Sequence, residues 1–111
     1  MENEIESWLS DIKLAIFEIN SFLPEKRNFV DFKRDLKTKR AIERNIEIIG
    51  EAVNRILKKD SEFPIRNAKR IVKTRNRIIH GYDSVSDDII WSIVIRELPD
   101  LEMEIKNLLA D

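Results

Sequence analysis

The feature that most constrains the fold is a set of apolar stripes whose members recur every three or four residues. The first stripe comprises Ile5, Trp8, Leu9, Ile12, Ile16, Ile19 and Leu23. Side chains at this spacing lie on one face of an α-helix, because the helix completes a turn about every 3.6 residues. The stripe therefore predicts a first helix, which Asn3 can cap and which Pro24 ends.

Two more helices follow from the same periodicity. A wide apolar stripe predicts a second helix from about Phe29 to Lys59, broad enough to contact more than one neighbour. A third helix is expected from about Ile65 to His80, with Gly81 placed as its C-terminal stop.

The last part of the chain predicts a fourth helix beginning near Ser86, whose side chain can cap it. Val85 and Ile90 have the spacing of a hydrophobic staple, and Pro99 either kinks the helix or separates it from a final one. With only 2 Gly and 3 Pro in 111 residues, the chain is expected to form an all-α, four- to five-helix up-and-down bundle. Residues 1–111 are expected to form a single domain.

Size and composition narrow the kind of site that such a bundle can carry. A chain of 111 residues supports one core, so a binding site is expected in a groove or at a subunit interface rather than in a deep pocket. The absence of cysteine excludes disulfides and thiolate metal sites. No apolar run approaches the length of a membrane span and the N-terminus is acidic, so we expect a cytoplasmic protein.

Charge is unevenly distributed along the chain. Residues 63–82 contain six bases and no acid, whereas residues 83–111 contain eight acids and two bases. The basic stretch could attract a polyanion such as RNA, with Lys69, Arg70, Lys73 and Arg77 as its candidate contacts. The alternative is that these residues form the solvated face of an ordinary helix.

Arg75 is the anomaly within this basic stretch. On a helical wheel it falls in the centre of the apolar stripe rather than among the other cations. A buried guanidinium without a partner is very costly, so Arg75 needs a carboxylate, a phosphate or water. One alternative is a salt bridge to a carboxylate on another helix. Asn76 and His80 lie at the edge of the same stripe, one helical turn apart.

These side chains have the chemistry required for RNA cleavage without a metal ion. Arginine binds phosphate with a planar fork of donors, and histidine can act as a general base or acid near neutral pH. His80 would take the proton from a ribose 2′-hydroxyl, and Arg75 would stabilise charge on the phosphate that this oxygen attacks. Because the chain contains one histidine, separate acid and base groups would require a two-fold dimer.

The stretch "RNRIIHGY" (Arg75–Tyr82) resembles the R-x4-H-x-Y motif of HEPN domains, with the Arg-Asn start typical of their ribonuclease members. The segments "RAIERNIEIIGEA" (Arg40–Ala52) and "GYDSVSDDIIWSIVIRELPDL" (Gly81–Leu101) are similar to the HepT-like toxin branch of that family. The resemblance covers roughly residues 36–109.

The resemblance implies an all-helical homodimer that acts as a metal-independent endoribonuclease with no cofactor. Arg75 and His80 would be the catalytic pair, with Asn76 in support. It also implies a type VII-like toxin–antitoxin system, in which an MntA-like nucleotidyltransferase transfers AMP from ATP to Tyr82. The added anion would block the phosphate site beside Arg75.

Other functions fit the sequence less well. A metal-dependent nuclease is disfavoured by the single histidine, and a DNA-binding helical module would leave His80 without a role. The strongest alternative is a non-catalytic HEPN module that binds a nucleotide or a nucleotidyltransferase partner.

Overall fold

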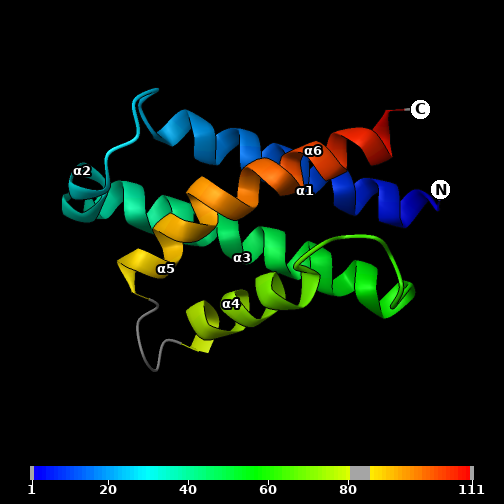
Figure 1. The fold of residues 1–111 in the computed structure, drawn as a ribbon. Helices are drawn as coiled ribbons and strands as arrows, with labels where there is room; N and C mark the ends of the chain where they lie inside the picture. The colour runs from blue at the N-terminus through cyan, green and yellow to red at the C-terminus, as the bar shows by residue number, and fades with distance from the viewer. Residues whose placement is uncertain (1, 81–85, 111) are drawn as a thin grey trace.

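The computed structural model describes residues 2–80 and 86–110, and all of its regular elements there are helical (Figure 1). They are α1 (Asn3–Phe22), α2 (Phe29–Arg34), α3 (Leu36–Lys59), α4 (Ala68–His80), α5 (Asp87–Ser92), the π-helical turn η1 (Ile93–Glu97) and α6 (Leu98–Leu109). Because α5, η1 and α6 follow one another without a break, the described residues form five continuous helical segments. The predicted all-α bundle of four to five helices is confirmed.

The long helices run up and down beside one another. In Figure 1, α1 and α3 lie side by side in opposite directions, α4 returns along the other side of α3, and α6 lies against α1. The shortest principal extent of the molecule is 18 Å, which corresponds to about two layers of helices at roughly 10 Å each. A molecule this thin places any functional site in a surface groove.

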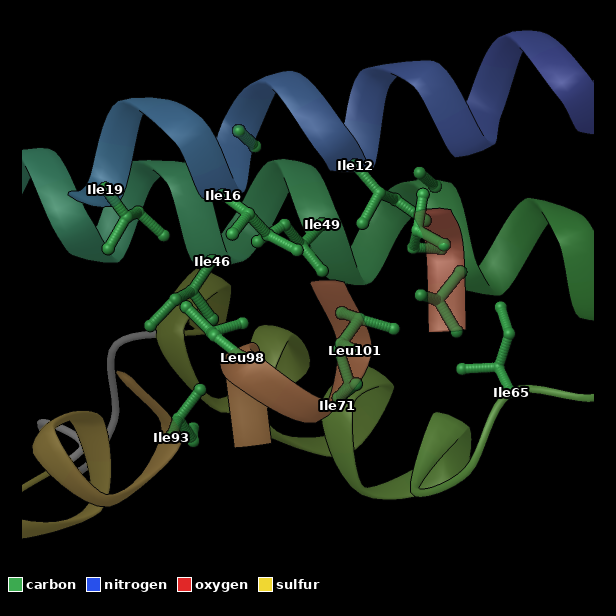
Figure 2. Close-up of a cluster of buried hydrophobic side chains, with 14 of the residues drawn as sticks. Ile12, Ile16, Ile19, Ile46, Ile49, Ile65, Ile71, Ile93, Leu98 and Leu101 are labelled. Atoms are coloured by element: carbon green, nitrogen blue, oxygen red, sulfur yellow. The ribbon is translucent and has the colours of Figure 1, made fainter. Parts of the chain in front are cut away.

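Isoleucine dominates the core between these helices. Figure 2 shows side chains from α1, α3, α4 and the α5–α6 segment meeting at its centre. Ile12, Ile19 and Ile42 are fully buried, as is Ile105 from the C-terminal helix. The apolar stripes read from the sequence therefore face one shared core, which the hydrophobic effect stabilises in proportion to the buried area.

The chain turns at Asp35, so the prediction of one helix from Phe29 to Lys59 is wrong. Asp35 has φ −99° and ψ 87°, outside the helical region. Its carboxylate accepts a hydrogen bond from the backbone N–H of Thr38 at 3.0 Å and another from the Thr38 hydroxyl. The aspartate thus caps α3 and separates it from α2, because the capped arrangement satisfies N–H groups that have no partner within the helix.

Two helix starts also differ from prediction. Asn3 is the first residue of α1 rather than its cap, and the preceding Glu2 makes no side-chain capping bond. The third helix, α4, begins at Ala68 rather than at Ile65. Asn67 directly before it has a φ of 62°, in the left-handed region that asparagine tolerates, so the helix cannot extend back through this residue. Ile65 remains buried although it lies outside the helix.

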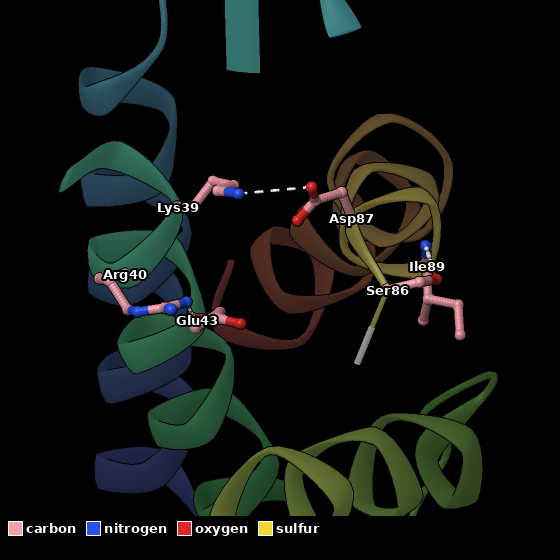
Figure 3. A network of polar contacts seen from close by, with 6 residues as sticks. All are labelled: Lys39, Arg40, Glu43, Ser86, Asp87 and Ile89. Atoms are coloured by element: carbon pink, nitrogen blue, oxygen red, sulfur yellow. Dashed lines mark hydrogen bonds and ion pairs between the residues drawn. The ribbon is translucent and has the colours of Figure 1, made fainter. Parts of the chain in front are cut away.

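The start of the last helical segment agrees with prediction. Ser86 accepts a hydrogen bond from the backbone N–H of Ile89, and Asp87 forms an ion pair with Lys39 of α3 at 3.3 Å (Figure 3). Pro99 does not divide the segment. It lies near the start of α6, directly after the π-helical turn Ile93–Glu97. A proline ring within a regular helix would crowd the preceding turn, and the wider π-helical turn changes the backbone path at this point. The predicted Gly81 stop and the Val85 half of the staple lie outside the described residues.

None of the described helices combines the length and apolar character needed to span a membrane.

Candidate functional site

A groove of about 340 Å³ lies over α3 and is bounded by α1 and α4. We call it the α3 groove. Its walls contain three arginines, three acids and four apolar side chains: Arg44, Arg55, Arg75, Asp11, Glu47, Glu51, Trp8, Ile48, Ala52 and Ile79. Of the proposed site residues within the described ranges 2–80 and 86–110, Arg75 is the one that lines this groove.

Gly50 allows α4 to approach α3 closely at the groove. A Cβ atom added at Gly50 would lie 2.2 Å from Arg75 Cβ and 2.6 Å from Arg75 Cγ. These distances are far shorter than the 3.5–4.0 Å or so of a favourable carbon–carbon contact. The stem of the Arg75 side chain therefore passes directly over the α3 backbone, in space that any other residue at position 50 would fill.

Arg75 obtains the carboxylate partner that its position requires. Its Nη2 donates to Glu51 Oε2, and its Nη1 donates to Asn76 Oδ1 at 2.8 Å. Its side chain is 22% exposed, and its Nε is buried without a hydrogen-bond partner. The alternative of a salt bridge to another helix is confirmed, and the pair lies in an open groove rather than inside the core.

Glu51 joins two arginines. While Oε2 accepts from Arg75, Oε1 accepts from Arg55 Nε at 3.1 Å, one turn further along α3. The carboxylate thus shares its charge with two guanidinium groups. Glu51 was not predicted as a site residue, because its partner Arg75 is 24 residues away in the sequence. The one sequence feature that could have indicated it is the pair of acids Glu47 and Glu51, four residues apart on α3.

Asn76 and His80 lie on the last two turns of α4, and both are exposed. Asn76 directly contacts Arg75, so the structure brings these two candidates together. His80 follows Asn76 by four residues and therefore lies one turn along a similar face. Tyr82, the proposed AMP acceptor, lies outside the described residues.

Ile79 departs from the expected apolar stripe of α4. A residue one helical turn after Arg75 lies on the same apolar stripe and is expected to face the core. Ile79 is nevertheless 46% exposed and lines the α3 groove. Thr74 is buried instead, and its hydroxyl donates to the Arg70 carbonyl at 3.1 Å. The C-terminal half of α4 thus presents an apolar side chain next to Arg75.

The four basic residues proposed as RNA contacts are exposed, but none of them lines the α3 groove: Lys69, Arg70, Lys73 and Arg77. Arg70 has a protein partner, because its Nε lies 3.4 Å from the buried carboxylate of Glu97. The basic face of α4 and the α3 groove are therefore separate surfaces of the same helix pair. Within residues 2–80 and 86–110, no group of three or more acidic or histidine side chains is arranged to hold a metal ion.

The fold and the site together define an all-helical protein with an Arg-x4-His motif at the end of a helix that borders a charged groove. The chain belongs to the Ribonuclease HepT-like family, whose model matches residues 12–108. This match extends beyond the motif to nearly the whole bundle and confirms the HepT-like resemblance.

Individual relatives agree with the family match. A Methanocaldococcus jannaschii protein whose name proposes an RNase is 32% identical, with 99% of this chain and 91% of that protein covered. The Thermococcus cleftensis protein named "Probable ribonuclease HepT" is 34% identical, with 97% of this chain and 98% of that protein covered. A Caldanaerobacter subterraneus protein, also named as a proposed RNase, is 40% identical over 74% of each chain. No solved structure gives a significant match.

Proposed function

We propose that this chain is a metal-independent endoribonuclease, the toxin of a type VII-like toxin–antitoxin system, with Arg75 and His80 as its catalytic residues and Asn76 in support. The observation that carries the proposal is the location of Arg75. Its guanidinium lies at the wall of an open groove, where it can reach a bound phosphate, and it precedes His80 by little more than one helical turn. Family membership supports the same activity.

The proposed reaction needs a base, an acid and a group that stabilises charge on phosphorus. His80 takes the proton from the ribose 2′-hydroxyl, and the oxygen attacks the adjacent phosphorus. Arg75 donates hydrogen bonds to the phosphate oxygens as negative charge builds up on them. The bond to the 5′-oxygen breaks, and that oxygen takes a proton from a second His80. The products are a 2′,3′-cyclic phosphate and a free 5′-hydroxyl.

The second histidine comes from a second copy of the chain in this proposal. Two features of the α3 groove support such a homodimer. Its three arginines and three acids balance, which suits self-association better than binding of a polyanion along its length. Trp8, Ile48 and Ile79 supply apolar surface. A two-fold axis through this face would bring two Arg75 and two His80 side chains towards one cleft.

Control by an antitoxin is the remaining part of the proposal. Tyr82 follows His80 by two residues, so AMP attached to its hydroxyl would introduce a phosphate close to the catalytic groups. An MntA-like nucleotidyltransferase is the proposed source of the AMP. Co-expression with such an enzyme should add the mass of AMP to wild type and leave Tyr82→Phe unchanged. An unmodified wild type, with an enzyme shown to be active, would contradict this control.

The nuclease proposal is tested by incubating purified protein with several classes of RNA in EDTA. Wild type should cut RNA and leave cyclic phosphate ends, whereas His80→Ala and Arg75→Ala, purified in the same way, should be inactive. Lys106→Ala is a matched control, since Lys106 is an exposed cation of α6 outside both the groove and the basic face of α4. Equal cleavage by wild type and the His80 variant would refute the assignment.

A non-catalytic HEPN module is the second candidate, and one observation favours it. Arg75 is already bound to a carboxylate in the single chain, as a purely structural arginine would be. A binding module predicts that wild type cuts no RNA, and that Arg75→Ala weakens binding of a nucleotide or of the nucleotidyltransferase.

A further inference from the structure

We propose that Glu51 is a positioning residue for the ribonuclease reaction, which fixes the guanidinium of Arg75 in the orientation that receives the phosphate. This inference rests on the proposed function and adds to it a residue outside the Arg-x4-His motif. It also gives a role to the α3 groove, whose wall carries both members of the pair.

The contacts hold the guanidinium group at both of its terminal nitrogens. Glu51 accepts from Nη2 on one side, and Asn76 accepts from Nη1 on the other. Gly50 allows the stem of Arg75 to lie against α3, so the start of the side chain is fixed as well. An arginine has five N–H donors in one plane. Glu51 and Asn76 each take one of these donors, and the donor on Nε is buried. Two donors remain, one on each Nη, and both can bind a phosphate.

The charge of Glu51 does not cancel the attraction of the site for a phosphate. Its second oxygen accepts from Arg55 Nε at 3.1 Å, so one carboxylate is shared between two cations. The cluster of Glu51, Arg55 and Arg75 has a net charge of +1. A carboxylate that is itself held in this way limits the motion of Arg75, because moving the guanidinium would break a charge-assisted hydrogen bond.

Preorganisation is the physical reason that such a contact matters for catalysis. A donor that already points to the place where charge develops needs no reorganisation during the reaction. A displacement of about 1 Å can lower a rate roughly 100-fold. An arginine side chain on the exposed end of a helix would otherwise sample many rotamers, and ordering it would cost free energy in the transition state.

The test compares Glu51→Ala and Glu51→Gln with Glu43→Ala, which removes an acid of α3 that pairs with Arg40 and lies outside the α3 groove. Oligomeric mass and melting temperature are measured for each variant. We expect kcat for RNA cleavage to fall about 10-fold to 100-fold in Glu51→Ala with little change in KM. Glu51→Gln should recover part of the loss, because an amide oxygen still accepts a hydrogen bond, and Glu43→Ala should resemble wild type.

A second readout does not depend on cleavage. In ¹⁵N-edited NMR spectra, the Nη groups of Arg75 should rotate slowly in wild type and in Glu43→Ala, and should average rapidly in Glu51→Ala. A purely structural Glu51 would lower the melting temperature and leave kcat of the folded protein unchanged. The inference is overturned if Glu51→Ala is as active as wild type or more active, or if the Arg75 signals do not change.

Failure of the two proposals can be told apart. If wild type cuts no RNA, the nuclease assignment fails, whereas the Arg75 signals still decide whether Glu51 fixes the guanidinium. If wild type cuts RNA and Glu51→Ala cuts equally well, the nuclease assignment stands and the positioning role fails.

Discussion

Substitution of Gly50 by alanine tests whether the close approach of α3 and α4 shapes the site. The added Cβ would lie 2.2 Å from Arg75 Cβ, about 1.3 Å closer than the roughly 3.5 Å of a favourable contact. Neither atom can rotate away, because each Cβ is attached directly to its backbone. Helix α4 must therefore move by about 1 Å, and Arg75 moves with it.

The expected change in the free energy of unfolding follows from two opposing effects. Alanine stabilises a helix interior relative to glycine by about 1 kcal/mol. Forced overpacking costs up to about 3 kcal/mol. The close contacts at Gly50 place the overpacking cost at the upper end of its range. After the helix-propensity gain is subtracted, Gly50→Ala should destabilise the protein by about 2 kcal/mol. The midpoint of thermal unfolding should fall by roughly 10 °C.

A double-mutant cycle isolates the clash. Arg75→Gly removes both atoms that the new Cβ would meet at less than 3 Å, and the next nearest atom, the Ile71 carbonyl oxygen, lies at an ordinary 3.4 Å. In this background Gly50→Ala should stabilise the protein by about 1 kcal/mol, since the helix-propensity gain remains. Urea unfolding of the four proteins measures both values. The reasoning is refuted if Gly50→Ala stabilises the wild-type background as well.

Two further substitutions test the polar features of the fold. Asn45 is buried, and its Nδ2 donates to the Ala15 carbonyl at 3.2 Å and to Glu18 Oε1 at 3.0 Å. Asn45→Ala should therefore cost about 1–3 kcal/mol in urea unfolding, and an unchanged midpoint would contradict a bridging role between α1 and α3. At the α2–α3 junction, the Thr38 hydroxyl and backbone N–H hold the pKa of Asp35 below its ordinary value. The contribution of this cap to the free energy of unfolding is present above about pH 3.9, the pKa of an unfolded aspartate. It is lost as the pH falls through the lower pKa of Asp35 in the folded protein. Asp35→Asn does not titrate, so its melting temperature should fall less steeply than that of wild type below about pH 4; parallel curves would contradict this.

Much of the core could be predicted from sequence because helical periodicity reports burial directly. Five of the seven residues in the first stripe are buried, and Trp8, which is only half-buried, lines the α3 groove instead. The Ser86 cap was predictable for a similar reason, since its signal is local. Features set within one or two turns of a helix can be read from a single sequence.

The break at Asp35 and the exposure of Ile79 were not predicted, because each depends on a competition that periodicity does not resolve. At Asp35 the apolar spacing continues, but a side-chain cap stabilises a turn there. At Ile79 the apolar character suggested burial, but α4 runs along the edge of α3 and leaves this residue 46% exposed. A local side-chain cap decided the first case, and the packing of α4 against α3 decided the second.

The candidate site shows the same division between local and long-range information. The Arg-x4-His motif and the misplaced charge of Arg75 were visible in the sequence. The identity of its partner was not, because Glu51 contacts Arg75 only when α3 and α4 pack together.

Gly50 and Glu51 are consecutive residues, and each acts on a different part of the same arginine. Gly50 leaves space for the stem of Arg75, and Glu51 accepts a hydrogen bond from its end group. A helix that approached α3 less closely would place the guanidinium further from the carboxylate, so the close packing and the polar contact depend on each other. The orientation of Arg75 is therefore set by the packing of α3 against α4. Substitutions of Gly50 or Glu51 in α3 should accordingly change the phosphate-binding part of the proposed site.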